Sequence, residues 1–131
     1  SEMCIRDSDE VPTAKIVDSL KDSLNSISSV DVLIHSLQKT IQQIQTDLSI
    51  IVEPGVDIGI VIHLAFLLDN LMKHEKSRVF ENLETFSKVY RLEMDIIRTN
   101  LISLERKYRV NIPENEVAFL TQMFIENKIK K

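Results

Sequence analysis

The 131-residue chain has few residues that make turns or crosslinks, with two glycines, three prolines and one cysteine. An all-β domain needs many tight turns, so this scarcity argues against one and favours helices joined by short connections. The single cysteine, Cys4, excludes an internal disulfide framework and is compatible with a reducing compartment. We therefore expect an all-α protein of the cytoplasm.

The chain also lacks an excess of positive charge and the short motifs that mark many catalytic sites. A net charge of −4 leaves no large basic surface for phosphate backbones, so we expect no direct nucleic-acid contact. No apolar run is long enough to span a membrane, and we expect no membrane association. Because no glycine-rich phosphate loop, HExxH, CxxC or nucleophile elbow is present, we expect no enzyme, no metal ion and no cofactor.

The first thirty residues divide into two segments of different character. Residues 1–8, SEMCIRDS, show no helical period and resemble one reading frame of a transposon-end adapter used to prepare sequencing libraries. We expect them to be a non-native tail on a fragment of a longer protein. Residues 9–30 are expected to form a linker or a first helix, with an apolar stripe of Ile16, Leu20, Leu24 and Ile27.

The longest apolar stretch, VDIGIVIHLAFLLDNLM, runs from Val56 to Met72 and is expected to be the central helix. Its apolar residues leave little room for a solvated face, which is typical of a buried helix. β-Branched residues in positions 58–62 make a strand the alternative. The length of the stretch and the absence of turn residues after Gly59 favour a helix.

Apolar residues at helical spacing predict four more helices, giving a compact bundle of five or six helices over residues 31–128. They span residues 31 to about 48 with Asp31 as cap, residues 80–89, residues 92–108, and a last helix with Pro113 in its first turn. Residues 53–55 are expected to turn, and residues 73–78, KHEKSR, to form a solvated loop. The final IKK is expected to be a solvated basic tail.

One strip of the central helix differs from the rest, because Gly59, His63, Phe66 and Asn70 recur there at helical spacing. A long helical side chain leans toward the N-terminus, so the His63 imidazole would lie over Gly59, where no side chain blocks access. The alternative is a hydrogen-bonded core residue, the usual role of a lone histidine on an apolar helix. His35, in HSLQKT, is expected to be an exposed structural residue.

Two segments of the chain, taken in order, resemble a known family. Residues 57–71, DIGIVIHLAFLLDNL, resemble a family helix that has a histidine followed three residues later by phenylalanine. Residues 106–123, RKYRVNIPENEVAFLTQM, are similar to a pattern of an aromatic residue, a short turn, Ile-Pro, an acidic residue, and then Glu-aliphatic-Ala-aromatic-aliphatic. The pair resembles the phosphotransferase-system regulation domain (PRD) of bacterial transcriptional regulators, over about residues 31–126.

The resemblance implies a homodimeric helical bundle in which His63 accepts phosphate from phosphocarrier proteins of the HPr or EIIB type. The supporting residues would be Gly59, Asn70 and Glu116. The family commonly has a second histidine seven residues after the position of Glu116, where this chain has Met123. It usually has arginine at the position of Asn70, and a cation there can stabilise an added phosphate.

The single-histidine pattern resembles the PRD near the C-terminus of levanase-type sigma-54 activators more than that of sugar antiterminators. The implied function is a phosphohistidine module of a sugar-responsive transcriptional regulator, in which phosphate on His63 shifts a dimer equilibrium. Two alternatives stay open. One is a structural dimerisation module that is not phosphorylated, which Asn70 and Met123 favour, and the other is the PRD of an antiterminator.

Overall fold

In the computed structural model, helices form nearly all the regular structure of the described residues, which are 17–18, 20–21, 23–24 and 26–129. The elements follow the order α3 (Val30–Leu48), β1 (Ile51–Val52), α4 (Val56–Met72), α5 (Leu83–Val89), α6 (Arg91–Tyr108), α7 (Glu114–Glu126) and β2 (Lys128–Ile129). The prediction of an all-α bundle is confirmed.

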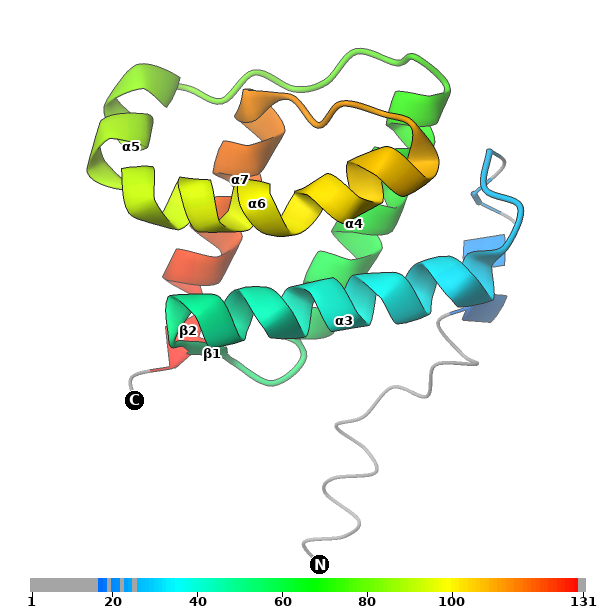
Figure 1. Cartoon of the computed structure of the whole chain (residues 1–131), viewed down its shortest axis with the longest axis horizontal. Coiled ribbons are helices and arrows are strands. Elements are labelled where there is room, and N and C mark those ends of the chain that lie inside the picture. The colour runs from blue at the N-terminus through cyan, green and yellow to red at the C-terminus, as the bar shows by residue number, and fades with distance from the viewer. Residues whose placement is uncertain (1–16, 19, 22, 25, 130–131) are drawn as a thin grey trace, which may run out of the picture.

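The helices form two crossed layers (Figure 1). Helices α3 and α6 pack side by side and run in opposite directions, and α4 and α7 cross behind them. Helix α3 contacts both α4 and α6, while the short helix α5 contacts α6 and α7 and closes one end. Residues 73–82 connect α4 to α5 and run across the edge of the bundle where α7 begins.

The core lies between the two layers and is built from the predicted apolar stripes. Each stripe is buried along most of its length, with Ile34, Leu37, Ile41 and Ile44 from α3, Met94, Ile97, Leu101 and Leu104 from α6, and Val117, Leu120 and Phe124 from α7. Complete burial of one such side chain contributes about 1.5–3 kcal/mol. The 3.6-residue period therefore identified the inward face of these three helices correctly.

Helix α4 has the predicted bounds but not the predicted burial. Ile60, Val61, Leu64, Ala65 and Leu68 are buried, as expected. Ile62 and Phe66, however, are 36% and 37% exposed, and Gly59 and Asn70 lie on the same exposed strip. The prediction of a helix without a solvated face was wrong, because α3 is the main neighbour of α4 and covers only one side.

Two helix starts differ slightly from the predicted ones. Ser29, and not Asp31, caps α3, since its side-chain oxygen accepts the Val32 backbone N–H at 3.4 Å. Asp31 lies in the first turn instead. Pro113 is the N-cap residue of α7 and precedes its first turn. Both shifts are within the one or two residues by which helix ends are commonly misplaced.

The last described residues form a short exposed strand, and Lys130 and Lys131 of the expected basic tail lie outside the described residues. Lys128–Ile129 pairs antiparallel with Ile51–Val52, with Ile51 opposite Ile129. The Glu53 backbone N–H donates to the Asn127 carbonyl at 2.9 Å beside this pair. A two-residue strand carries no usable sequence period, so the pairing that joins the end of α7 to the approach to α4 was not foreseen.

The described part of the predicted first segment packs on the bundle. Residues 17, 18, 20 and 21 are helical, and Val17, Leu20, Leu24 and Ile27 are buried in the common core. The Ser26 N–H donates to the buried Asp69 carboxylate of α4 at 2.8 Å. Ile16 and the expected non-native tail, residues 1–8, lie outside the described residues.

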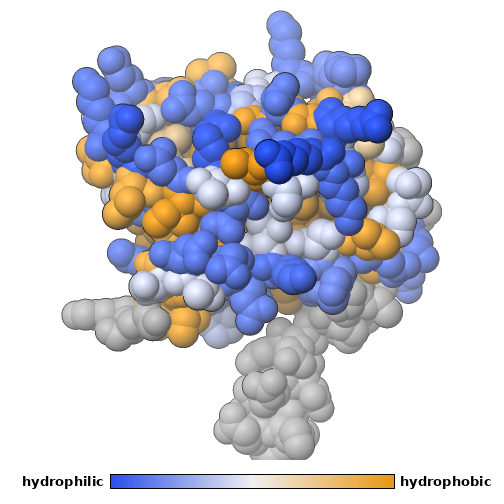
Figure 2. Space-filling view, viewed as in Figure 1, coloured by the Kyte–Doolittle hydropathy of each residue, from blue (hydrophilic) through white to orange (hydrophobic). Residues whose placement is uncertain are grey.

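The surface seen in Figure 2 is mostly hydrophilic over α3 and α6, with hydrophobic side chains gathered at the end where α5 lies. Val89 and Leu92, at the junction of α5 and α6, are 65% and 69% exposed. Within the described residues, no helix has both the length and the apolar character needed to cross a membrane.

Candidate functional site

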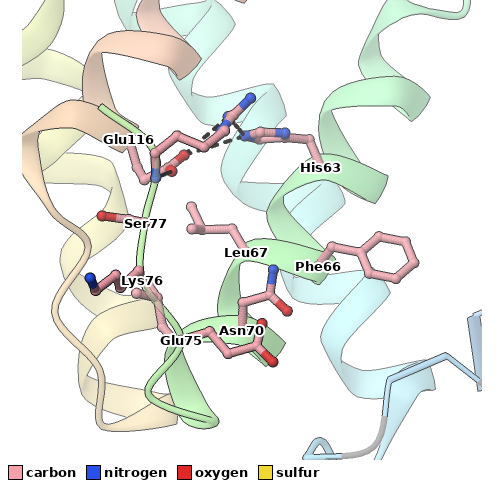
Figure 3. Close-up of a pocket in the computed structure, with 10 residues that line it drawn as sticks. His63, Phe66, Leu67, Asn70, Glu75, Lys76, Ser77 and Glu116 are labelled. Carbon is pink, nitrogen blue, oxygen red and sulfur yellow. Dashed lines mark hydrogen bonds and ion pairs between the residues drawn. The ribbon is translucent and has the colours of Figure 1, made fainter. Parts of the chain in front are cut away.

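Three polar side chains from three separate parts of the chain meet at one edge of the bundle. His63 projects from α4 toward Glu116 at the start of α7 (Figure 3). Arg78 comes from the connection between α4 and α5. The Arg78 Nη2 atom lies 3.3 Å from His63 Nε2 and 3.2 Å from Glu116 Oε1. His63 Nε2 is 3.8 Å from the same carboxylate oxygen.

The triad of His63, Arg78 and Glu116 borders an open pocket of about 240 Å³. The remaining wall comes from α4 and the following connection, through Leu67, Asn70, Lys76 and Ser77. The His63 side chain is 24% exposed, so its ring is accessible from the pocket even though it is packed on other sides. A small anionic group at this edge would meet one imidazole and one guanidinium at once.

Arg78 is held in place because its segment is fastened to the first turns of α7. The Arg78 backbone N–H donates to Glu116 Oε2 at 3.2 Å, and the Phe80 N–H donates to Asn115 Oδ1 at 2.8 Å. The guanidinium lies 4.0 Å from the centre of the Phe119 ring, and the Phe80 ring packs edge-on against Phe119. Residues 73–78 form the exposed connection that the sequence predicts, and the Arg78 side chain is itself 55% exposed, but its contacts with α7 were not predicted.

The Glu116 carboxylate is buried, with 3% of its side chain exposed, and three features compensate for its charge. It accepts one hydrogen bond from the Arg78 backbone and one from the Arg78 guanidinium. It also lies in the first turn of α7, where the positive end of the helix dipole stabilises an anion. A buried charge that is paired and hydrogen-bonded is retained at much lower cost than an isolated one.

His63 is held as a neutral imidazole whose Nε2 lone pair accepts a hydrogen bond from Arg78. Burial lowers the pKa of His63 below its usual value, the nearby Arg78 charge lowers it further, and Glu116 opposes them by raising it. A guanidinium has donors only, so Arg78 donates to Nε2 and the proton of the neutral ring is on Nδ1. The arrangement pairs a nitrogen nucleophile with a cation that can bind an incoming anion.

The structure brings together some of the residues expected at the site but not all. Glu116 lies beside His63 as a member of the triad, and Asn70 lines the same pocket and is exposed. Gly59 lies on α4 outside the residues that line this pocket, and a Cβ atom there would meet nothing within 4 Å. His35 is exposed on α3.

Sequence reasoning missed Arg78, which stands 15 residues after His63 and 38 before Glu116. Nothing in the run KHEKSR distinguishes this arginine from the cations beside it. The one available signal was indirect, since the family's usual arginine is absent at Asn70 and another cation had to be sought elsewhere.

Comparison with known proteins identifies the PRD domain over residues 38–127, a span that contains α4, Arg78 and Glu116. No curated protein and no solved structure matches the chain. PRD domains are regulatory rather than catalytic, and in general they are modules of transcription regulators under phosphotransferase-system control. The matched span covers most of the chain and all the residues of the triad, so the chain belongs to the PRD family.

Proposed function

We propose that His63 accepts a phosphoryl group and thereby controls a sugar-responsive transcriptional regulator. The observation that carries this proposal is the partly exposed His63 imidazole at the edge of an open pocket, with its Nε2 atom 3.3 Å from the Arg78 guanidinium. Membership of the PRD family supports it, because that family is generally regulated by phosphorylation.

The reaction is a phosphoryl transfer from a phosphocarrier protein of the HPr or EIIB type. The Nε2 lone pair of His63 attacks the phosphorus atom and forms a P–N bond. The bond between phosphorus and the carrier side chain breaks, and its electron pair returns to the carrier. Bond formation places a positive charge on the ring, and the ring then releases its Nδ1 proton to water. The lowered pKa of the imidazole keeps Nε2 unprotonated before the transfer.

The transfer changes the electrostatics of the edge of the bundle. The new group carries about −1.5 to −2 charges by analogy with other phosphorylated residues, and it arrives beside the buried Glu116 carboxylate. The side chains at this edge must then rearrange to separate the two negative charges. The exposed apolar residues Ile62 and Phe66 lie on the same helix as His63, so a rearrangement of this helix would reach them. We propose that α4 faces a second copy of the chain and that phosphate shifts the dimer equilibrium.

The setting of the module follows from the same proposal. It acts in the cytoplasm, as part of a larger regulator, and does not itself contact nucleic acid. Because Met123 stands where many PRDs have a second histidine, the single-site arrangement favours a levanase-type sigma-54 activator over an antiterminator.

A structural dimerisation module without phosphorylation is the second candidate. Asn70 favours it, because an amide at the position of the family's arginine brings no charge to the pocket. Sedimentation velocity before and after treatment with phosphodonor separates the two. A phosphate-dependent change in the dimer fraction supports the regulatory module, and an unchanged dimer in a chain that takes up no phosphate supports the structural one.

The direct test is to incubate the chain with the general phosphotransfer proteins and labelled phosphoenolpyruvate, and to measure acid-labile phosphate. We expect incorporation that His63→Ala abolishes. His35→Ala and His74→Ala are matched controls on exposed histidines and should retain it. Absence of label, or label that persists in His63→Ala, contradicts the proposal.

A further inference from the structure

We propose that Arg78 is the residue that binds the phosphoryl group on His63, and that Glu116 holds Arg78 until that group arrives. This inference rests on the proposed function, since it assumes that His63 is phosphorylated. It gives Arg78, in the α4–α5 connection, the role of binding the phosphoryl group. On phosphorylation the Arg78 guanidinium would exchange Glu116 for the phosphoryl group as its ion-pair partner.

The position of the guanidinium carries the first step of the argument. The Nη2 atom of Arg78 is 3.3 Å from the nitrogen that would be phosphorylated. The oxygens of a phosphoryl group bonded to that nitrogen would therefore lie within reach of the guanidinium. Arginine binds phosphate through charge-assisted hydrogen bonds that are stronger than neutral ones. Asn70 lines the same pocket, at the position where the family usually has an arginine, but its amide is uncharged. Arg78 supplies the positive charge that this position lacks.

Competition between two anions carries the second step. The guanidinium is shared in the unphosphorylated site, with Nη2 3.2 Å from Glu116 Oε1. A phosphoryl group bears more charge than one carboxylate and would draw the guanidinium away from Glu116. Glu116 can lose this contact at reduced cost, because it keeps the Arg78 backbone N–H at 3.2 Å and the positive end of α7.

The anchoring of the Arg78 segment determines which groups move when Arg78 changes its ion-pair partner. Phe80 fixes the connection to Asn115 and Phe119, both on α7, so the side chain of Arg78 can turn while its backbone stays attached. The guanidinium would leave the face of Phe119, which it now covers at 4.0 Å. Phosphate on α4 is thereby sensed at the first turns of α7 without a large movement of either helix.

The test uses the full chain phosphorylated with phosphoramidate, a small donor that needs no partner protein, and measures the pKa of the attached phosphate by ³¹P NMR titration. An adjacent guanidinium favours the dianion and lowers that pKa, so Arg78→Gln should raise the titration midpoint by about one pH unit. Lys88→Gln is the matched control, because it removes the same charge from an exposed residue of α5 outside the pocket, and its midpoint should stay close to that of the unsubstituted chain.

Glu116→Gln provides a shift in the opposite direction. It removes the competing carboxylate while keeping an oxygen for the Arg78 backbone N–H, so the phosphate midpoint should fall below that of the unsubstituted chain. This variant decides the matter if Arg78→Gln does not fold or takes up no phosphate.

The results separate this inference from the function on which it rests. A midpoint unaltered by Arg78→Gln, an equal shift in Lys88→Gln, or no fall in Glu116→Gln overturns the role of Arg78 alone. Absence of phosphate from His63 in the unsubstituted chain, with both phosphoramidate and the phosphotransfer proteins, overturns the proposed function and this inference with it.

Discussion

His63 owes its chemical state to three neighbours that act in different directions. Burial and the Arg78 charge both disfavour the imidazolium, and the Glu116 carboxylate favours it. Protonation of Nε2 would also replace an accepted hydrogen bond from Arg78 with two donors facing each other. The first two effects prevail, so the ring keeps a lone pair available on the side that faces the pocket.

The first prediction is that His63 titrates below the ordinary histidine value of 6.5. Arg78→Gln should raise the midpoint, because it removes a nearby positive charge, and Glu116→Gln should lower it further. Ring ¹⁵N NMR of the folded chain measures all three midpoints. A His63 midpoint that Arg78→Gln leaves in place would show that the guanidinium does not act on the imidazole.

The same shift predicts the sign of a pH effect on stability. A lowered pKa in the folded state means that the unfolded chain binds a proton more readily. The contribution of His63 is therefore complete above pH 6.5 and is lost as the pH falls from 6.5 through the folded-state pKa. Urea titrations across this window should show a loss on acidification that is smaller in His63→Ala.

How much of the site the sequence predicts differs from residue to residue. The sequence singles out His63 as an imidazole on an apolar helix, and the family pattern adds Glu116 and the roles of both residues, which stay predictions. Arg78 was missed because its role depends on where the connection crosses the start of α7, and neither spacing nor period encodes that crossing. A contact between residues 38 positions apart needs the fold before it can be seen.

Among the secondary-structure elements, α4 and the turn before it contain both glycines of the chain, in opposite circumstances. Gly55 has a φ of +89°, a conformation that L-residues adopt only with strain. Gly59 lies within the helix, exposed, with open space where a Cβ would be. Gly55 is needed for its left-handed backbone conformation. Gly59 lowers helix stability, and no neighbouring atom requires a glycine there.

The second prediction concerns this pair of glycines. Gly59→Ala should stabilise the chain by about 0.5–1 kcal/mol, since alanine is the better helix former and meets no neighbour. Gly55→Ala should destabilise it by about 1–2 kcal/mol, because of the left-handed backbone. Urea unfolding of both variants measures the two signs. A stability loss in Gly59→Ala would mean that the exposed strip of α4 is crowded in solution, as a dimer contact there would require.

In the whole molecule, a buried carboxylate of α4 accepts a hydrogen bond from the described N-terminal residues, which also pack on the bundle through buried apolar side chains. Asp69 is 1% exposed, accepts the Ser26 N–H at 2.8 Å, and forms an ion pair with Lys73 at 2.8 Å. The hydrogen bond to Asp69 raises the pKa of Lys73. Because Asp69 follows His63 on the same helix, this contact links the site helix to the segment that precedes α3.

The third prediction is that Asp69→Ala destabilises the chain by about 1–3 kcal/mol, the cost of leaving buried hydrogen-bonding groups without a partner. Asp95→Ala removes an exposed carboxylate from α6 and should change stability by no more than about 0.5 kcal/mol. Urea unfolding compares the two. Equal effects would mean that Asp69 is not a structural tie.

For the fold as a whole, sequence period predicted the helices and their inward faces, because a packed core selects one side of each helix. It singled out the strip of Gly59, His63, Phe66 and Asn70 but did not predict how far α4 is exposed there, which depends on how many neighbours the helix has. It also missed the β1–β2 pair, which depends on two chain segments meeting far apart in sequence. The predicted boundary between a linker or first helix, residues 9–30, and the helical domain, residues 31–128, stays a prediction.

The measurement that tests the account most directly is a ¹H–³¹P correlation spectrum of the chain after phosphorylation by the phosphotransfer proteins. Coupling between phosphorus and the ring protons identifies the residue and the nitrogen that carry the phosphate. We expect one acid-labile phosphate, on Nε2 of His63, the atom that faces Arg78. Phosphate on Nδ1, on His35 or on His74, or a chain that stays unmodified while its donor is active, would contradict the account.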